Sequence, residues 1–290
     1  FNLNGMGSQG GRMEEADYVE LIGALHFLPE TENHDTTIIN VQTRLAFYSS
    51  AGQLIGNVST SSYGGIAMAM PELYAEAVNI MGTPWSAWIG AKFFRGNDIH
   101  MADYFYFDDH SSQGFGISYK NTNFAITFPG NVDTANALPP NFYVNIVDGT
   151  PRLGLRGRSM LIMEQVIPLK TPLNYVKFLA EYHHLANGTN SDTTTAFNYP
   201  SASGWVAGVK YVANLKTKIP GSFNQVAIRY GHGIANGGDG GNSRTWLTYG
   251  APDLGTNKFK NANSITVDEH LMLNLSPKYS LNAYGIYTKS

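Results

Sequence analysis

The sequence predicts an all-β protein built of antiparallel strands. Apolar and polar residues alternate with a period of two in several separated segments, which is typical of a strand with two different faces. Charged residues make up only 14% of the 290 residues, against roughly 25% in an ordinary soluble domain. The chain is nevertheless 43% hydrophobic, so it can bury a sizeable core or face lipid.

Three segments carry the alternation. From Tyr18 to Phe27, the residues of one parity are apolar or glycine, while the other parity is mixed and includes Glu20 and His26. The same split recurs from Thr37 to Tyr48 and from Phe223 to Tyr230. Because consecutive side chains of a strand point to opposite faces, each segment has one apolar face. The side chains expected to face lipid include Val19, Leu21, Leu25, Val226 and Ile228.

A soluble sandwich would give the same alternation, with its apolar face turned inward. Strand-like segments of about ten residues favour a membrane barrel, because strands of globular proteins usually have about five or six. No run of about 18 apolar residues occurs, so a closed barrel is the one membrane-spanning structure that remains. Aromatic residues near strand ends suit the interfacial girdles of such a barrel, and they are Phe27, Phe47, Tyr48, Phe128 and Tyr230.

Long polar stretches without apolar periodicity separate the strands. Two of them, Asn187–Ser203 and His232–Asn263, are expected to be surface loops, with the glycine-rich run Asn236–Asn242 exposed and flexible. By contrast, Ile219–Ser222 indicates a tight turn. Long and short connections therefore alternate, as they do in outer-membrane barrels. We expect residues 1–290 to form a single β-barrel domain.

Composition excludes several functions. With 19 Lys and Arg against 22 Asp and Glu, the formal net charge is −3, so no basic surface is available for nucleic acid. The absence of Cys excludes a disulfide framework, a thiolate zinc site and a thiol nucleophile. No cofactor and no metal site are expected.

The segment from Trp88 to Ser112 is the most specific part of the chain. It reads WIGAKFFRGNDIHMADYFYFDDHSS, in which a lysine among aromatic residues precedes Asp98-Ile99-His100-Met101 and Asp103, and four aromatic residues and Asp108 follow. This block resembles a stretch of the maltoporin-like sugar porins over about a dozen consecutive positions, far more than a short motif provides. Weaker similarity extends through residues 18–21 and 221–224.

The resemblance implies an antiparallel transmembrane β-barrel of the eighteen-stranded sugar-porin type, located in the bacterial outer membrane. It implies a homotrimer in contact with lipid and lipopolysaccharide, and facilitated passive diffusion of maltose or maltodextrin-type oligosaccharides without enzymatic activity. Sugar porins of this type have longer chains than 290 residues, so the sequence is expected to be a fragment with about thirteen strands, lacking the native N- and C-terminal strands.

The resemblance also implies roles for individual residues. Such porins carry a row of aromatic rings along the channel, the greasy slide, and a constriction loop folded into the lumen. Tyr18 and Phe223 match slide rings, and Phe105 takes the place of a constriction tyrosine. Glu20 and Asp103 match acidic groups that bind sugar hydroxyls.

The constriction loop is expected to span Asp98–Asp109, with Asp103 beside or opposite a basic residue. The family's basic position falls at Gly96, so the neighbouring Arg95, or Lys92 as second candidate, is expected to serve instead. The full set of candidate substrate-binding residues is Tyr18, Glu20, Lys92, Arg95, Asp98, His100, Asp103, Phe105 and Phe223.

The residues themselves support two of these roles independently. Tyr18 and Phe223 lie on the polar parity of their strands, where an aromatic ring otherwise has no reason to be. A pyranose has an apolar face that an aromatic ring can cover and a rim of hydroxyls that charged groups can bind. Several modest sites in series would let a sugar pass without holding it tightly.

Two alternatives remain open. A soluble all-β carbohydrate hydrolase could use a pair of carboxylates from Asp98, Asp103 and Asp108. A nonspecific diffusion porin would have the same barrel but no aromatic rings on the lumen-facing parity. His100 with Asp98 and Asp103 could also form a metal or acid–base cluster, but a role in the structure of the folded loop is favoured.

Overall fold

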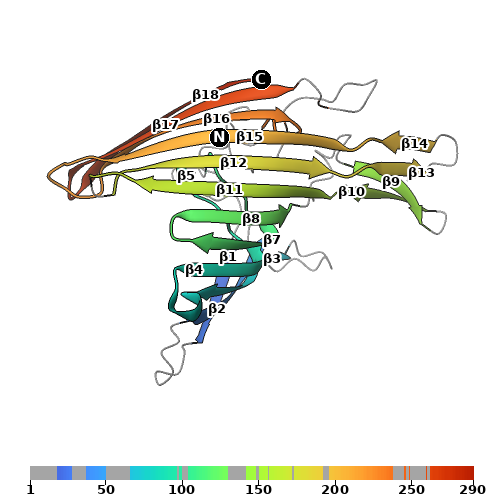
Figure 1. Cartoon of the computed structure of the whole chain (residues 1–290), viewed down its shortest axis with the longest axis horizontal. Helices are drawn as coiled ribbons and strands as arrows, with labels where there is room; N and C mark the ends of the chain where they lie inside the picture. The colour runs from blue at the N-terminus through green and yellow to red at the C-terminus, as the bar shows by residue number, and fades with distance from the viewer. Residues whose placement is uncertain are drawn as a thin grey trace.

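The computed structural model describes residues 18–27, 37–49, 66–96, 98–99, 104–129, 142–147, 150–155, 157–171, 173–191, 196–237, 245, 248, 259 and 262–290. Most of these residues form one twelve-stranded antiparallel sheet, in which each strand pairs with the next strand of the sheet along the chain (Figure 1). The sheet therefore has the simple meander order expected of a membrane barrel. Among the described residues, no helix is long and apolar enough to cross a membrane.

The strands of the sheet are β1 (Tyr18–Phe27), β2 (Ile38–Ser49), β3 (Ile66–Val78), β4 (Trp85–Lys92), β7 (Ser112–Tyr119), β8 (Thr122–Phe128), β11 (Arg158–Pro168), β12 (Tyr175–Leu185), β15 (Ala202–Asn214), β16 (Phe223–Gly233), β17 (Asn263–Ser276) and β18 (Tyr279–Lys289). Three further pairs are β5 (Asp98–Ile99) with β6 (Tyr104–Phe105), β9 (Phe142–Val147) with β10 (Thr150–Leu155), and β13 (Gly188–Ser191) with β14 (Ala196–Tyr199). A short 3₁₀ turn, η2 (Ile80–Gly82), joins β3 to β4.

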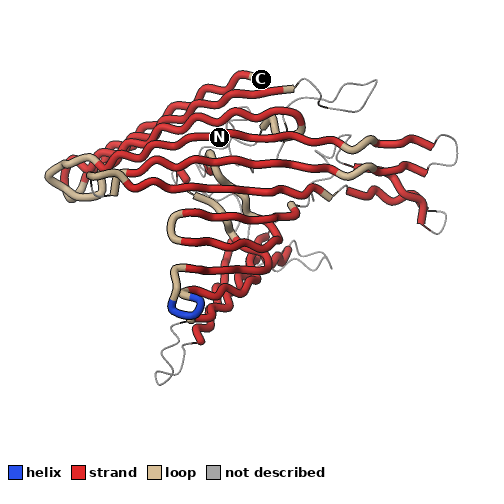
Figure 2. The backbone as a smooth tube through the Cα atoms, viewed as in Figure 1, coloured by secondary structure: helices blue, strands red, loops and turns tan. Residues whose placement is uncertain are grey.

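The predicted strands agree with the observed ones. The segment 18–27 is β1, the segment 37–48 differs from β2 by one residue at each end, and the segment 223–230 is the first part of β16. Short turns such as residues 120–121 and 277–278 lie at one end of the sheet, and the long connections lie at the other (Figure 2).

The expectation of a surface loop over Asn187–Ser203 is wrong in one respect, because part of this stretch forms strands. This stretch contains the β13–β14 hairpin, which lies beyond the end of the sheet that carries the long connections (Figure 1). Backbone pairing in a hairpin does not require an apolar face, so a polar sequence without periodicity can still form strands. Composition alone therefore underestimated the length of the β-structure here.

The two faces of the sheet differ in chemistry. Cross-strand pairing places Glu164, Lys177, Glu181 and Lys210 on one side, called here the inner face. The opposite, outer face is apolar and exposed over most strands. Its exposed side chains include Val19, Leu21, Leu25, Phe27, Ile89, Phe115, Phe124, Leu161, Phe178, Trp205 and Ile228. This is the face that a membrane barrel presents to lipid, and Val226 lies on it in a partly buried position.

The hydrophobic core lies between the inner face and the loop that joins β4 to β7. Tyr106 and Phe107 of this loop pack with apolar residues of five strands, namely Ala125, Met160, Ile162, Leu179, Val206 and Ala227. The Phe107 ring lies against Gly208, where an added Cβ would come within 2.8 Å of it. A side chain at that position would displace the ring, so the glycine makes room for the loop.

The glycine-rich run also differs from its prediction. Asn236 and Gly237 follow β16 and are buried, together with Ile234 and Ala235. The Gly237 carbonyl accepts a hydrogen bond from the Arg229 guanidinium at 2.6 Å, and this contact draws the backbone onto the inner face. The expectation of an exposed loop is therefore wrong for Asn236 and Gly237, and residues 238–242 lie outside the described residues.

Candidate functional site

The connection between β4 and β7, residues 93–111, is called here the inner loop, because its described segments 93–96 and 106–111 lie against the inner face. Its two ends are held together, because the His110 backbone N–H donates to the Phe94 carbonyl at 2.8 Å. Its first residue is fixed to the strands that form the inner face, called here the wall. The Phe93 N–H donates to Glu72 Oε1 of β3 at 3.0 Å. Residues 106–111 are all buried. The described part of the predicted constriction loop thus lies folded onto the inner face.

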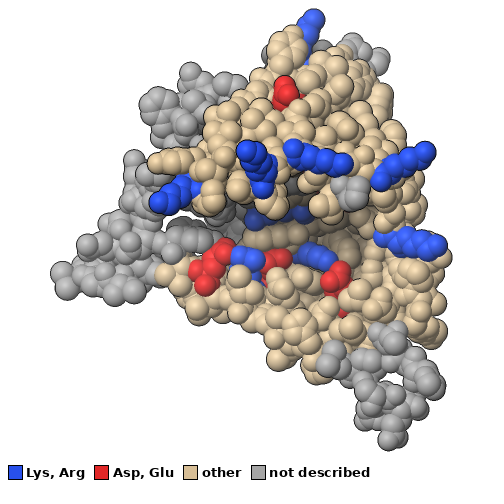
Figure 3. All heavy atoms as spheres, turned by 90° about the vertical axis from the view of Figure 1, so that its left-hand side faces the viewer, with Lys and Arg blue, Asp and Glu red and all other residues tan. Residues whose placement is uncertain are grey.

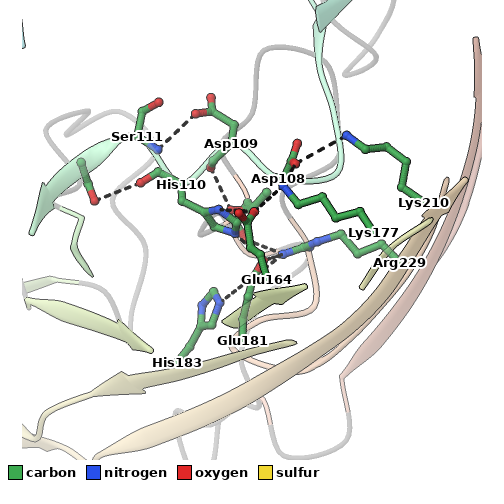
Figure 4. Close-up of polar contacts among 12 residues, drawn as sticks. Asp108, Asp109, His110, Ser111, Glu164, Lys177, Glu181, His183, Lys210 and Arg229 are labelled. Carbon is green, nitrogen blue, oxygen red and sulfur yellow. Dashed lines mark hydrogen bonds and ion pairs between the residues drawn. The ribbon is translucent and has the colours of Figure 1, made fainter. Parts of the chain in front are cut away.

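Asp108 ties the inner loop to three strands through a buried ionic cluster (Figure 4). Its Oδ2 lies 2.5 Å from Lys177 Nζ of β12 and 3.5 Å from Lys210 Nζ of β15. Lys177 also reaches Glu164 Oε1 of β11 at 2.6 Å. Opposite charges from the loop and the wall therefore compensate one another in a largely buried cluster, in which Lys177 keeps some contact with solvent.

A second buried cluster lies beside the first. Glu181 of β12 binds His110 Nε2 at 2.8 Å and His183 Nε2 at 2.7 Å. The Arg229 guanidinium of β16 bonds both oxygens of the same carboxylate, at 2.9 and 2.8 Å. One carboxylate thus joins the inner loop to two strands (Figure 4).

The two clusters shift the pKa values of Asp108 and His110 in the inner loop. Burial alone would raise the pKa of the Asp108 carboxyl, but the ammonium groups of Lys210 and Lys177 outweigh burial and lower the pKa to about 2. Burial alone would lower the pKa of His110, but the Glu181 carboxylate outweighs it and raises the pKa above its ordinary value. Each shift favours the charged form that the wall binds.

A partly exposed group of charges lies on the inner face of β1 to β4. Arg44 is bonded both to Glu20 and to Glu72, with its Nε 2.7 Å from Glu72 Oε2. Lys92 pairs with Glu76 at 2.7 Å. The Arg44–Glu20 and Lys92–Glu76 pairs retain more contact with solvent than the clusters around Asp108 and Glu181 do. They are therefore charged groups of the inner face that a solute can reach.

The two predicted basic residues both lie against aromatic rings. The Arg95 guanidinium carbon is 4.3 Å from the centre of the Phe93 ring. Lys92 Nζ is 4.8 Å from the centre of the Tyr74 ring and 5.6 Å from that of Trp88. Such cation–π contacts hold the cations in place over the rings. Their predicted position relative to Asp103 cannot be compared, since Asp103 lies outside the described residues.

Phe223 begins β16 on the inner face. Its ring meets His270 edge-on, with centroids 5.0 Å apart and an interplanar angle of 90°. His270 is fixed by Asn282 at 2.7 Å and lies 6.4 Å from the Tyr106 ring of the inner loop. The Tyr106 hydroxyl donates to Gln225 at 2.8 Å. The ring of Phe223 is thus part of an aromatic group that also includes Tyr106 of the inner loop.

The other predicted site residues are only partly described. Tyr18, Asp98 and Phe105 occupy β1, β5 and β6, and their side chains lie outside the described residues. His100, like Asp103, lies outside the described residues altogether. Glu20 is placed on the inner face by its bond to Arg44. The structure thus brings Glu20, Lys92 and Arg95 to the β1–β4 side, and Phe223 to the opposite part of the inner face.

Sequence reasoning missed the wall residues that bind the inner loop. They are Glu164, Lys177, Glu181, Lys210 and Arg229. A signal for them was present in the alternation. In segment 175–185, charged residues occupy one parity and the aromatic residues Phe178 and Tyr182 occupy the other. Their loop partners could not be found in this way.

The end of the sheet that carries the short turns is hollowed. Lys and Arg side chains border the hollow on one side, and acidic and basic side chains together border it on the other (Figure 3). Within the described part of the chain, no three His, Asp or Glu residues are placed to hold a metal ion. The charged groups around the hollow are suited to contacts with polar solutes.

These features define a class of protein, a membrane β-sheet protein of the porin type, with an apolar outer face, a charged inner face and a loop folded onto the inner face. The chain belongs to the LamB porin family, whose family model, described as LamB porin, matches residues 1–290. LamB porins are sugar channels of the outer membrane built as eighteen-stranded barrels. A search of curated proteins finds no match.

Proposed function

We propose that this protein is a sugar-selective channel through which maltose or maltodextrin-type oligosaccharides diffuse passively across the outer membrane. We further propose that it works as a homotrimer in contact with lipid and lipopolysaccharide. Membership of the LamB porin family supports the sugar channel. The choice of sugar and the path that it follows rest on the residues of the inner face.

The position of Phe223 is the observation that carries the proposal. Its partly exposed ring lies in the same inner-face row as Gln225 and Arg229, whereas the other described phenylalanines of the sheet lie on the outer face. An aromatic ring among polar groups can cover the apolar face of a pyranose while those groups bind its hydroxyls. We assign Phe223, with Tyr18 of β1, to an aromatic path for sugar.

The charges of the inner face fall into two groups with different tasks. Asp108 and His110 are buried and paired with the wall, so they hold the inner loop and are not accessible to a sugar. Glu20, Lys92 and Arg95 are partly exposed, so we assign them to the sugar hydroxyls. In this arrangement the inner loop narrows the channel, and its constriction contains Asp98, His100, Asp103 and Phe105.

A hydrolase is not favoured by the described carboxylates. Glycoside hydrolysis needs a carboxylic acid with a raised pKa that can donate a proton. The pKa of Asp108 is instead lowered to about 2, after Lys210 and Lys177 have outweighed the effect of burial. Glu181 is occupied by Arg229 and two histidines.

The proposal is tested by single-channel recording in planar bilayers with maltose, longer maltodextrins and glucose. We expect transient block of the ion current by maltodextrins, with affinity that rises with chain length, because a longer sugar covers more of the path. Normal ion current without block by any sugar would indicate a nonspecific diffusion porin. Release of shorter sugars from maltodextrin would indicate a hydrolase.

A further inference from the structure

The connection between β16 and β17, residues 234–262, meets the inner loop at Thr245. Thr245 is fully buried and donates twice to one acceptor, the backbone carbonyl of Asp109. Its N–H lies 3.1 Å from that oxygen, and its Oγ1 lies 2.8 Å from it. Asp109 stands between Asp108 and His110, the two residues that bind the wall. The connection therefore contacts the inner loop at the point where the loop is anchored.

Arg229 links the same two segments a second time. One of its terminal nitrogens donates to the Gly237 carbonyl at 2.6 Å, and the other lies 3.4 Å from the Thr245 carbonyl. That second nitrogen also binds Glu181, whose carboxylate accepts from His110 of the inner loop. Strand, connection and inner loop thus share one buried hydrogen-bond network.

Thr248 and Phe259 of the connection contact the wall instead of the inner loop. Thr248 bonds the Ile234 carbonyl and accepts from Arg158 at 2.9 Å. Phe259 packs with Leu185 and Ile234 in a separate buried cluster. Thr245 is therefore distinguished from Thr248 by its partner, since the first bonds the inner loop and the second bonds the wall.

We propose that the β16–β17 connection positions the inner loop, and that Thr245 and Arg229 are the positioning residues through which it acts. This inference rests on the proposed function for its sugar readout but not for its ion readout. A loop fixed from both the wall and the connection keeps a constant channel width. Without the hydrogen bonds from the connection, the inner loop fluctuates, and the channel current fluctuates with it.

The test is single-channel recording of the full chain with Thr245→Val, which keeps the shape and removes the hydroxyl. We expect increased open-channel noise, and maltodextrin block weakened roughly two- to tenfold through faster sugar dissociation, which is the scale of one lost hydrogen bond. Thr245→Ser restores the hydroxyl and should behave like the parent. Thr248→Val is the matched control, with the same substitution in the same connection, and should leave both readouts unchanged.

Arg229→Lys provides a second variant in case Thr245→Val forms no channels. Lysine keeps the charge beside Glu181 but cannot bond two carbonyls in a fork, so the same rise in noise is expected. Quiet channels with parental block in both Thr245→Val and Arg229→Lys would overturn the inference, as would equal effects of Thr245→Val and Thr248→Val. Increased noise in a channel that no sugar blocks would support the positioning role while refuting the proposed sugar path.

Discussion

The ammonium group of Lys177 lies 2.5 Å from the Asp108 carboxylate and joins the inner loop to strand β12. The same ammonium group binds Glu164 of β11 at 2.6 Å, so one cation compensates two buried acidic groups. Breaking a buried ion pair is costly because the remaining charge stays in a medium of low polarity. The position of the inner loop therefore depends on Lys177.

Replacement of Lys177 by Met should loosen the inner loop. The variant leaves Asp108 with the longer contact to Lys210 and removes the nearer cation of Glu164, whose contact to His110 is 3.9 Å long. We expect a loss of about 3–5 kcal/mol in the free energy of unfolding, the scale for removing one partner of a buried pair. Urea unfolding in lipid vesicles measures this loss.

Lys210→Met is the control for this experiment. Lys210 is as buried as Asp108, but its Nζ is 3.5 Å from the carboxylate, and the shorter pair with Lys177 remains after its removal. A smaller loss of stability and a quieter channel than in Lys177→Met are expected. Equal losses in the two variants would contradict the leading role of Lys177.

The Asp108 anchor also predicts a dependence on pH. Its folded pKa of about 2 lies below the value of about 4 for an unfolded Asp, so its contribution is present above about pH 4 and is lost as the pH falls through about 2. The pKa of His110 is raised, so its pair with Glu181 is fully present below its unfolded pKa of about 6.5 and is lost only as the pH rises through its folded pKa. Mild acid should therefore leave the loop in place.

Single-channel noise recorded from pH 7 down to pH 2.5 measures this dependence. We expect constant noise to about pH 4 and a steep rise below it. Asp108→Asn removes the titrating carboxyl and should abolish the rise. A transition near pH 6, or one that persists in Asp108→Asn, would show that another group controls the loop.

The strands could be predicted from the sequence because alternation reports directly on the two faces of a sheet. The bounds of β1 followed from the alternation of segment 18–27, and the inner-face position of Phe223 followed from its parity with Gln225 and Arg229. Each of these inferences needs only neighbours within one strand.

The buried clusters could not be predicted because they depend on contacts between distant segments. Lys177 and Asp108 are 69 residues apart, and Thr245 and Asp109 are 136 residues apart. Their pairing requires both the strand register and the path of the inner loop. The burial of Gly237 was missed for a different reason. The glycine content around it indicated exposure, whereas the buried Arg229 guanidinium, eight residues earlier, uses the Gly237 carbonyl as a hydrogen-bond acceptor.

Leu21 and Ile22 offer a test of the two faces within one strand. They are adjacent in β1 and almost equally exposed, at 56% and 57%, but Leu21 points to the outer face and Ile22 to the inner face opposite Arg44. Leu21→Glu should reduce the free energy of unfolding by on the order of 2 kcal/mol, because it places a charge in lipid. Ile22→Glu should be tolerated, since its charge faces the channel. Equal destabilisation would argue against a lipid-facing outer surface.

Phe223 allows the aromatic path to be tested separately from the fold. Phe223→Ala removes a partly desolvated aromatic contact, so maltodextrin binding should weaken by about 1–2 kcal/mol, while the ion conductance changes little. Phe178→Ala is the matched control, because that ring is exposed on the outer face and should not affect sugar binding. Titration of current block with maltodextrin gives both affinities, and Tyr18→Ala should resemble Phe223→Ala. Parental sugar affinity in Phe223→Ala would remove Phe223 from the path, whereas reduced affinity in both phenylalanine variants would indicate a general disturbance of the barrel.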